Sequence, residues 1–141
     1  MKRVASRTKR SLPLAGTLGL GLADFKGVYV ATLSGTFHTS GAPFYGFVYL
    51  DADGNGGVTG GWEIQVPNGT ILGGLGPAQS TYTVTAQGRV ELTLASTASS
   101  NVLSVTVYLA DHNQSILGRG GFVLGGNPPA GGVGSICGRK Q

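Results

Sequence analysis

From Phe25 onward, the chain consists of short runs in which hydrophobic and polar residues alternate, separated by glycine, asparagine and aspartate. The alternation is cleanest over residues 89–94 and 103–109, where every second position is Val or Leu. A period of two predicts strands with one buried and one solvated face. No segment of 11 or more residues shows the period of an amphipathic helix, so we expect an all-β protein.

The run over residues 44–50 departs from this pattern because it carries large hydrophobic side chains at almost every position. In a strand, Tyr45, Phe47 and Tyr49 lie on one face and Phe44 on the other. We expect one set of rings to line the interior and the other to lie outside, at an interface.

Turn-forming residues separate the runs, most clearly at residues 51–56, 68–69 and 87–88. Short connections of this kind make neighbours in sequence into neighbours in space. We therefore predict an antiparallel up-and-down barrel of about eight strands, because closure removes exposed strand edges. An open β-sandwich is the alternative. Glycines inside the runs, such as Gly35, are expected to allow the bends that closure needs.

The length of 141 residues is that of one domain. The 26 glycines and the low content of charged residues, 11%, favour short strands and tight turns over helices. A single cysteine excludes an intramolecular disulfide. We expect one β-barrel domain over residues 24–141, held together by its core and its strand ladders.

The first 23 residues differ from the rest in charge and hydropathy. Five basic residues and no acidic one lie in residues 1–11, and an apolar run over residues 12–23 follows, with Gly21 and Ala23 at its end. This is the layout of a secretory signal that is cut before Asp24, and the apolar run is too short to span a membrane. The alternative is a basic N-terminal arm that stays on the protein, since such arms bind nucleic acid or join subunits.

The net charge of +4 comes from this N-terminal segment, because only five basic and six acidic residues remain without residues 1–23. The predicted domain lacks the basic field that attracts phosphate backbones. A nucleic-acid partner is therefore expected only if residues 1–23 are retained. We expect a secreted, periplasmic or cell-envelope location, and the composition leaves a homo-oligomer open.

One segment begins like a calcium-binding loop. Asp51, Asp53 and Asn55 stand at alternate positions before Gly56, as in an EF-hand. The twelfth position, which needs a bidentate glutamate, is Trp62, and no helical pattern flanks the segment. A glycine-rich hairpin turn is therefore the favoured interpretation, and we predict no metal and no cofactor.

Two further groups with possible chemistry lie on a predicted turn and near the C-terminus. Asp111 and His112 are adjacent on the turn, and no G-x-S-x-G motif is present, so the sequence does not support a hydrolytic triad. Cys137 ends a last short run over residues 133–137, before a polar tail. We expect Cys137 to be a small buried side chain, with a reactive or intermolecular thiol as the alternative.

Tyrosines and the single tryptophan are the candidates for a binding pocket. The interior of a small barrel is either filled by side chains or holds one small ligand. Core packing is the favoured role of the inward rings, and a pocket for a small apolar ligand is the alternative. The candidate pocket residues are Tyr29, Tyr45, Tyr49, Trp62 and Tyr82.

Several short motifs resemble a group of uncharacterised exported bacterial proteins. They are Lys26-Gly27-x-Tyr29 with Ser34-Gly35, Gly-Ala-Pro-Phe at residues 41–44, Asp-Gly-Asn-Gly-x-Val-Thr-Gly at residues 53–60, the strand pair over residues 82–94, and the final Lys140-Gln141. The resemblance spans nearly all of residues 26–141. It implies secretion and a small barrel of lipocalin-like or avidin-like character, without a known reaction. The chain departs from the pattern at Pro128-Pro129 and at Cys137.

These observations favour a secreted or envelope-associated, non-enzymatic barrel that binds a small apolar ligand or a surface partner. A self-assembling subunit of a shell or filament, with a retained basic arm, is one alternative. A cyclase-like or isomerase-like barrel enzyme is the other. Such an enzyme needs a carboxylate such as Glu63 or Glu91 inside the barrel, and the alternation places Glu91 on the solvated face.

Overall fold

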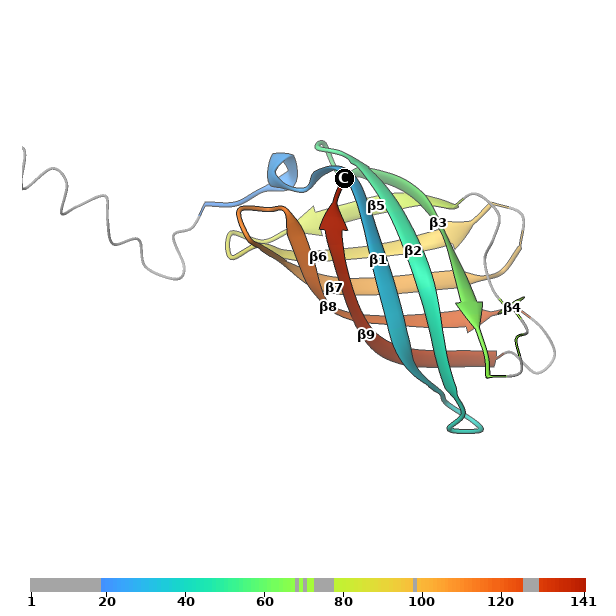
Figure 1. Cartoon of the computed structure of the whole chain (residues 1–141). Helices are drawn as coiled ribbons and strands as arrows, with labels where there is room; N and C mark the ends of the chain where they lie inside the picture. The colour runs from blue at the N-terminus through green and yellow to red at the C-terminus, as the bar shows by residue number, and fades with distance from the viewer. Residues whose placement is uncertain (1–18, 68, 70, 73–77, 98, 126–129) are drawn as a thin grey trace, which may run out of the picture.

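The strands of the protein coincide with the predicted runs (Figure 1). The structure is a computed structural model of the chain and describes residues 19–67, 69, 71–72, 78–97, 99–125 and 130–141. Its strands are β1 (Lys26–Phe37), β2 (Pro43–Asp53), β3 (Gly57–Gln65), β4 (Ile71–Leu72), β5 (Ala78–Val84), β6 (Arg89–Ser96), β7 (Val102–Ala110), β8 (Ser115–Leu124) and β9 (Ala130–Lys140). The predicted turn position Asn68 and the Pro128-Pro129 pair lie outside the described residues.

The sheet closes on itself as an eight-stranded antiparallel barrel, with the short β4 added beside β3. Going round the barrel, β1, β2, β3, β5, β6, β7, β8 and β9 each pair with the next strand, and β9 returns to β1. This is the predicted up-and-down barrel. The open sandwich is excluded because the first and last strands hydrogen-bond along most of their length, from Tyr29 opposite Lys140 to Phe37 opposite Gly132.

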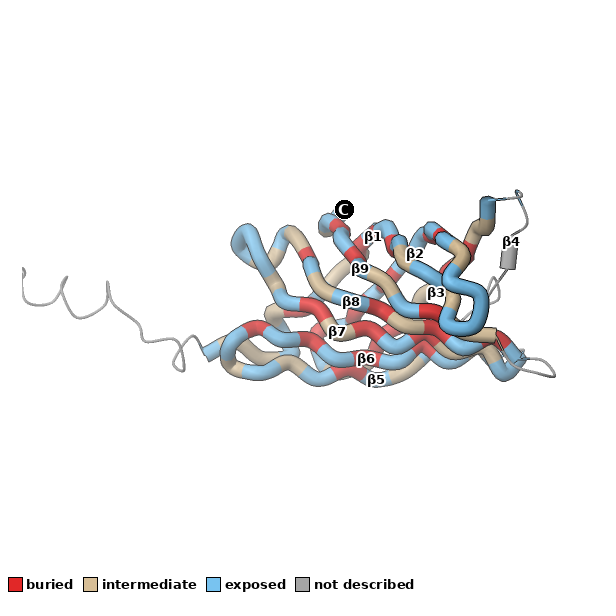
Figure 2. The backbone as a smooth tube through the Cα atoms, turned by 90° about the horizontal axis from the view of Figure 1, so that it is seen from below, coloured by how far each residue is buried: buried red, intermediate tan, exposed pale blue. Residues whose placement is uncertain are grey.

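The interior of the barrel is filled by hydrophobic and aromatic side chains. Buried and exposed residues alternate along the strands, as Figure 2 shows, so that every second side chain points inward. Among the described residues, no polar or charged residue is buried. Each large apolar side chain removed from water stabilises the fold by roughly 1.5–3 kcal/mol, and this shared core holds the barrel closed.

Two glycines show why closure depends on residues without a side chain. At Gly35 in β1, an added Cβ would collide with the backbone carbonyl of Val133 in β9. At Gly46 in β2, it would collide with the carbonyl of Glu63 in β3. Neighbouring backbones therefore approach each other too closely at these points for any other residue.

Residues 19–25 cover one end of the barrel, beside the C-terminus (Figure 1). Leu20 donates its backbone N–H to the carbonyl of Ala86 in the turn between β5 and β6, at 3.1 Å. A short 3-10 turn, Leu22–Asp24, follows, and Phe25 is completely buried. The last residues of the predicted signal or arm thus lie against the barrel, while residues 1–18 lie outside the described part. No helix in the described residues is long and apolar enough to cross a membrane.

The final strand is longer than the sequence pattern predicts. The pattern ends the run at Cys137, but β9 continues through Arg139 to Lys140. The additional residues pair with β1, where Arg139 lies opposite Val30. The hydrophobic pattern failed here because the one inward position, Gly138, is a glycine: an added Cβ would meet Ala31 of β1 at 2.5 Å.

Candidate functional site

Two of the predicted pocket residues, Tyr29 and Tyr82, pack inside the barrel end that residues 19–25 cover. The ring of Phe25 lies between them, with centroid distances of 4.9 Å to Tyr29 and 5.0 Å to Tyr82. The Tyr29 hydroxyl donates to the carbonyl of Asn113 at 2.7 Å. The Tyr82 hydroxyl lies 2.8 Å from the carbonyl of Phe25 and 2.9 Å from that of Leu22. These hydroxyls join the N-terminal segment and a turn to the core.

Burial changes the acidity of both phenols. Removal from water raises the pKa of Tyr29 to about 12, and the neighbouring Tyr82 adds to the shift. Burial also raises the pKa of Tyr82. Both hydroxyls therefore stay protonated at neutral pH, in the form that donates hydrogen bonds.

A third predicted pocket residue, Trp62, is buried in a separate ring cluster. Its ring centroid lies 5.9 Å from that of Phe122, which in turn packs edge-to-face against Phe44 and Phe37. The indole Nε1 is buried and has no hydrogen-bond partner among the described residues. An unpaired buried N–H costs roughly 1–3 kcal/mol, so the packing of the large ring must offset this cost.

The remaining two predicted pocket residues, Tyr45 and Tyr49, lie on the outside of β2, as does Phe47. Their exposed fractions are 52%, 47% and 41%, respectively. The five predicted pocket residues therefore occupy two separate places, three in the core and two on the outer surface. The division follows the alternation along β2, which places Phe44 inside and the other three rings outside. The doubly apolar run in the sequence was the signal for this arrangement.

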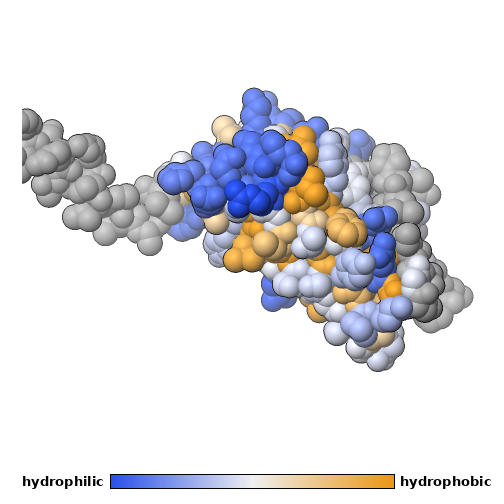
Figure 3. Space-filling view, in the orientation of Figure 1, coloured by the Kyte–Doolittle hydropathy of each residue, from blue (hydrophilic) through white to orange (hydrophobic). Residues whose placement is uncertain are grey.

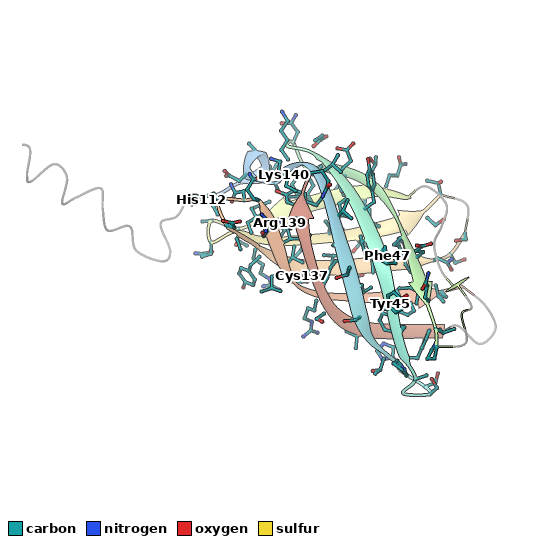
Figure 4. All side chains as sticks on the ribbon, viewed as in Figure 1. Tyr45, Phe47, His112, Cys137, Arg139 and Lys140 are labelled. Carbon is teal, nitrogen blue, oxygen red and sulfur yellow. The ribbon has the colours of Figure 1, made fainter. Side chains whose placement is uncertain are left out.

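The outer rings of β2 face a matching row on β3. Tyr49 lies opposite Gly61, Phe47 opposite Glu63, and Tyr45 opposite Gln65. Figure 4 shows Tyr45 and Phe47 along the same strand, and their rings meet edge-to-face at 5.9 Å. We call this set of six residues the aromatic face.

The aromatic face is hollowed at Gly61. Apart from the chain neighbours, no heavy atom of the described residues lies within 4 Å of the position that a Cβ would occupy there. A cleft of about 310 Å³ opens at this point, between the rings of Phe47 and Tyr49 and the side chain of Glu63. Val30 of β1 borders it, and the space-filling view shows hydrophobic side chains across the middle of this side of the barrel (Figure 3).

Two more clefts continue the hollow along the same hairpin. One of about 330 Å³ lies beside Tyr45 and Gln65 and reaches Pro67. The other, of about 530 Å³, lies at the opposite end and is polar. It is lined by Asp51, Asp53, Gly57, Val58, Thr59, Gln79, Ser80 and Thr81. The first two clefts follow β2 and β3, and the polar cleft extends from the end of β2 across β3 to β5.

Cleft volume alone does not distinguish this side of the barrel. A cleft of about 340 Å³ also lies over β5, β6 and β7, but serine and threonine hydroxyls dominate its lining. Its border carries Glu91, which forms a 3.0 Å salt bridge with Arg89. The exposed rings are what sets the aromatic face apart.

The residues that resemble a calcium loop form a hairpin turn at the polar end of the aromatic face. The Asp53 Oδ1 accepts the backbone N–H of Asn55 at 2.7 Å and that of Gly57 at 2.9 Å. These hydrogen bonds hold the pKa of Asp53 below its usual value. No group of three or more potential metal-ligating side chains occurs in the described part of the chain. Asp53 and Asn55 therefore have a structural explanation in turn geometry, whereas Asp51 lies in β2 opposite Thr59.

Carboxylates on the aromatic face have few positive partners. Lys26 lies opposite Asp53 across β1 and β2 and lowers its pKa. Within the described residues, neither Asp51 nor Glu63 forms a salt bridge. Glu63 on the aromatic face and the adjoining Asp51 and Asp53 thus place a local excess of negative charge beside the half-exposed rings.

The expected burial of Cys137 is wrong, because its side chain is exposed. Ile136 occupies the inward position, so its neighbour on β9 points outward. Cys137 lies between Leu117 of β8 and Thr32 of β1, and Figure 4 shows it on the outer side of its strand.

The carboxylates and the histidine that sequence reasoning considered for catalysis are not in the core. Glu63 is half-buried on the outer side of β3, and Glu91 is exposed on β6. His112 is exposed in the turn between β7 and β8. Glu63, Glu91 and His112 therefore form no cluster inside the barrel.

Comparisons with protein-family models, with curated proteins and with solved structures found no match. The fold and the surface therefore define only a class: a closed up-and-down β-barrel with a filled interior and an aromatic, acidic groove on its outer side.

Proposed function

We propose that this protein is an exported, non-enzymatic barrel that binds a component of the cell surface through its aromatic face. The observation that carries the proposal is the row of three half-exposed rings, Tyr45, Phe47 and Tyr49, beside the open position at Gly61. Exposed rings lose the stabilisation that burial would provide, and grouped exposed apolar surface on a soluble domain marks interaction sites. Rings with polar neighbours are also typical of binding surfaces.

The interior supports a structural role rather than a ligand pocket. Tyr29, Tyr82 and Trp62 each pack against another buried ring, and both tyrosine hydroxyls bond to backbone carbonyls of the same chain. A buried ligand would have to displace these contacts. A ligand bound in the outer groove would not have to displace these buried contacts.

The export part of the proposal rests on the layout of residues 1–23, with its basic start, apolar run and small residues before Asp24. A cut there would remove the backbone contact of Leu20 with Ala86 and the Leu22 carbonyl that lies next to the Tyr82 hydroxyl. It would leave Phe25 and the hydrogen bond between its carbonyl and the Tyr82 hydroxyl.

The test is to express the full chain in a bacterium, separate cytoplasm, envelope and medium, and determine the N-terminus of the product by mass spectrometry. We expect an N-terminus at Asp24 outside the cytoplasm. The purified mature protein should bind isolated envelopes, and the Gly61→Thr variant should not. A cytoplasmic product that keeps Met1, or equal envelope binding by Gly61→Thr, would contradict the proposal.

A further inference from the structure

The geometry points to a linear glycan without acidic groups as the partner of the aromatic face. This inference rests on the proposed function of that face and specifies the chemistry of what it binds. The occupant would lie along β2 and β3, with sugar rings stacked on Phe47 and Tyr49 over Gly61, and with hydroxyls directed to Glu63 and Gln65.

The shape of the groove favours an extended molecule. Side chains two positions apart on one strand are separated by about 7 Å, so Tyr45, Phe47 and Tyr49 form a row of rings at regular intervals. Two clefts follow this row, from Pro67 to Tyr49. The polar cleft continues beyond the last ring, at Asp51 and Asp53, and extends over β5. A compact ligand would use one cleft, whereas a chain of repeating rings would use both clefts along the row.

The residue chemistry fits a sugar ring better than a purely apolar partner. A pyranose has a C–H face that packs on an aromatic ring and a rim of hydroxyls that need hydrogen-bond partners. The aromatic face offers both surfaces, because each ring of β2 lies opposite a β3 residue that is either small or polar. The carboxylate of Glu63 accepts hydrogen bonds, and the amide of Gln65 both donates and accepts them.

The charge of the face excludes several other polymers. Asp51 and Glu63 have no salt-bridge partner in the described residues and would repel the phosphates of nucleic acids. They would also repel the anionic headgroups of a bilayer surface. An extended peptide could not pair with β2, because β2 is already paired on both sides, with β1 and β3. A neutral glycan or an amino-sugar glycan would not be repelled by these carboxylates and would not need to pair with a strand.

The test uses calorimetric titration of the mature protein with three hexasaccharides: cellohexaose, which is neutral; the chitosan hexamer, which is cationic; and oligogalacturonate, which is anionic. We expect binding of at least one of the first two and none of the third. The variant Phe47→Ala should weaken that binding roughly tenfold, as for a stacked ring at the centre of a site. The variant Glu63→Gln should weaken binding of the chitosan hexamer more than that of cellohexaose, because only the former loses an attraction between opposite charges, and so separates the two sugar chemistries.

Two variants separate a binding defect from a folding defect. Gly61→Thr fills the hollow with a residue that suits a strand. No heavy atom of the described residues, other than the chain neighbours, lies within 4 Å of the new Cβ, so the variant should abolish binding at unchanged thermal stability. Tyr108→Ala is the matched control, because Tyr108 on β7 is 51% exposed, like Tyr45, and its loss should leave the affinity unchanged.

The glycan inference and the proposed function fail in different ways. If no hexasaccharide binds while Gly61→Thr still abolishes binding to envelopes, the partner is not a glycan but the face is still a binding site. If oligogalacturonate binds best, or if Gly61→Thr binds the sugars normally, the inference is overturned. If Gly61→Thr also binds envelopes normally, the proposed function is overturned with it.

Discussion

The β2–β3 hairpin carries aromatic rings on both of its faces, and the rings on the two faces differ in burial. On the inner face, Phe44 and Trp62 are almost completely buried, and both pack against Phe122. On the outer face, Tyr45 and Phe47 remain about half exposed and meet only each other among the rings. Packing explains the inner rings fully. It does not explain the outer ones, and this is why the outer face is the better candidate for function.

The outer side of β6 shows what an ordinary solvated face of this barrel looks like. Arg89 and Glu91 form a salt bridge there, and Thr93 continues the row. The strand geometry is the same as in β2, so the difference lies only in which residues occupy the outward positions. Four measurements test the difference between the inner and outer side chains of the barrel.

The largest effect is expected on the inner face. Phe44→Ala should lower the free energy of unfolding by about 3–5 kcal/mol, because it leaves a cavity among closely packed rings. Phe44 is 4% exposed, and its ring centroid lies 4.9 Å from that of Phe122. Urea unfolding followed by circular dichroism gives the value. A loss below about 1 kcal/mol would show that the core is not packed as described.

The second effect concerns pH. Unfolded tyrosine ionises near pH 10, whereas the pKa of Tyr29 in the folded protein is about 12. The unfolded state therefore loses its proton first, and stability should be fully present below pH 10 and fall as the pH rises toward 12. Urea midpoints measured between pH 8 and pH 11.5 test this. The variant Tyr29→Phe should show a shallower fall, and an equal fall would assign the effect to other groups.

A smaller effect is expected at Trp62. Trp62→Phe removes ring contacts, but it also removes an indole N–H that has no partner among the described residues. The two changes oppose each other, so the free energy of unfolding should change by no more than about 1 kcal/mol. Denaturant titration measures it. A loss above about 3 kcal/mol would indicate that the N–H is in fact hydrogen-bonded.

The smallest effect is expected on the outer face. Tyr45→Ala should change the free energy of unfolding by no more than about 0.5 kcal/mol, as for most surface substitutions. The same urea series as for Phe44→Ala gives the comparison directly, since the two residues are adjacent on β2. A cost similar to that of Phe44→Ala would mean that the outer rings serve stability, and the functional interpretation of the aromatic face would lose its basis.

Much of the architecture could be predicted from the alternation of residues. The period of two over residues 89–94 and 103–109 corresponds to β6 and β7, and the doubly apolar run over residues 44–50 lies within β2. The end of β9 and the exposure of Cys137 could not be predicted in this way. Small residues and glycines give little hydropathy contrast, so the pattern does not show which of their sides is buried.

The all-β class, the order of the hairpins and the division of the β2 rings between two faces follow from local periodicity and turn residues, so they could be predicted from the sequence alone. Which face of each strand points inward, the pairing of β9 with β1, and the separation of Tyr45 and Tyr49 from the buried rings depend on contacts between distant parts of the chain. Alternation along a strand defines two faces but does not show which of them is buried. The buried face is determined by long-range strand pairing and by the packing of one common set of side chains.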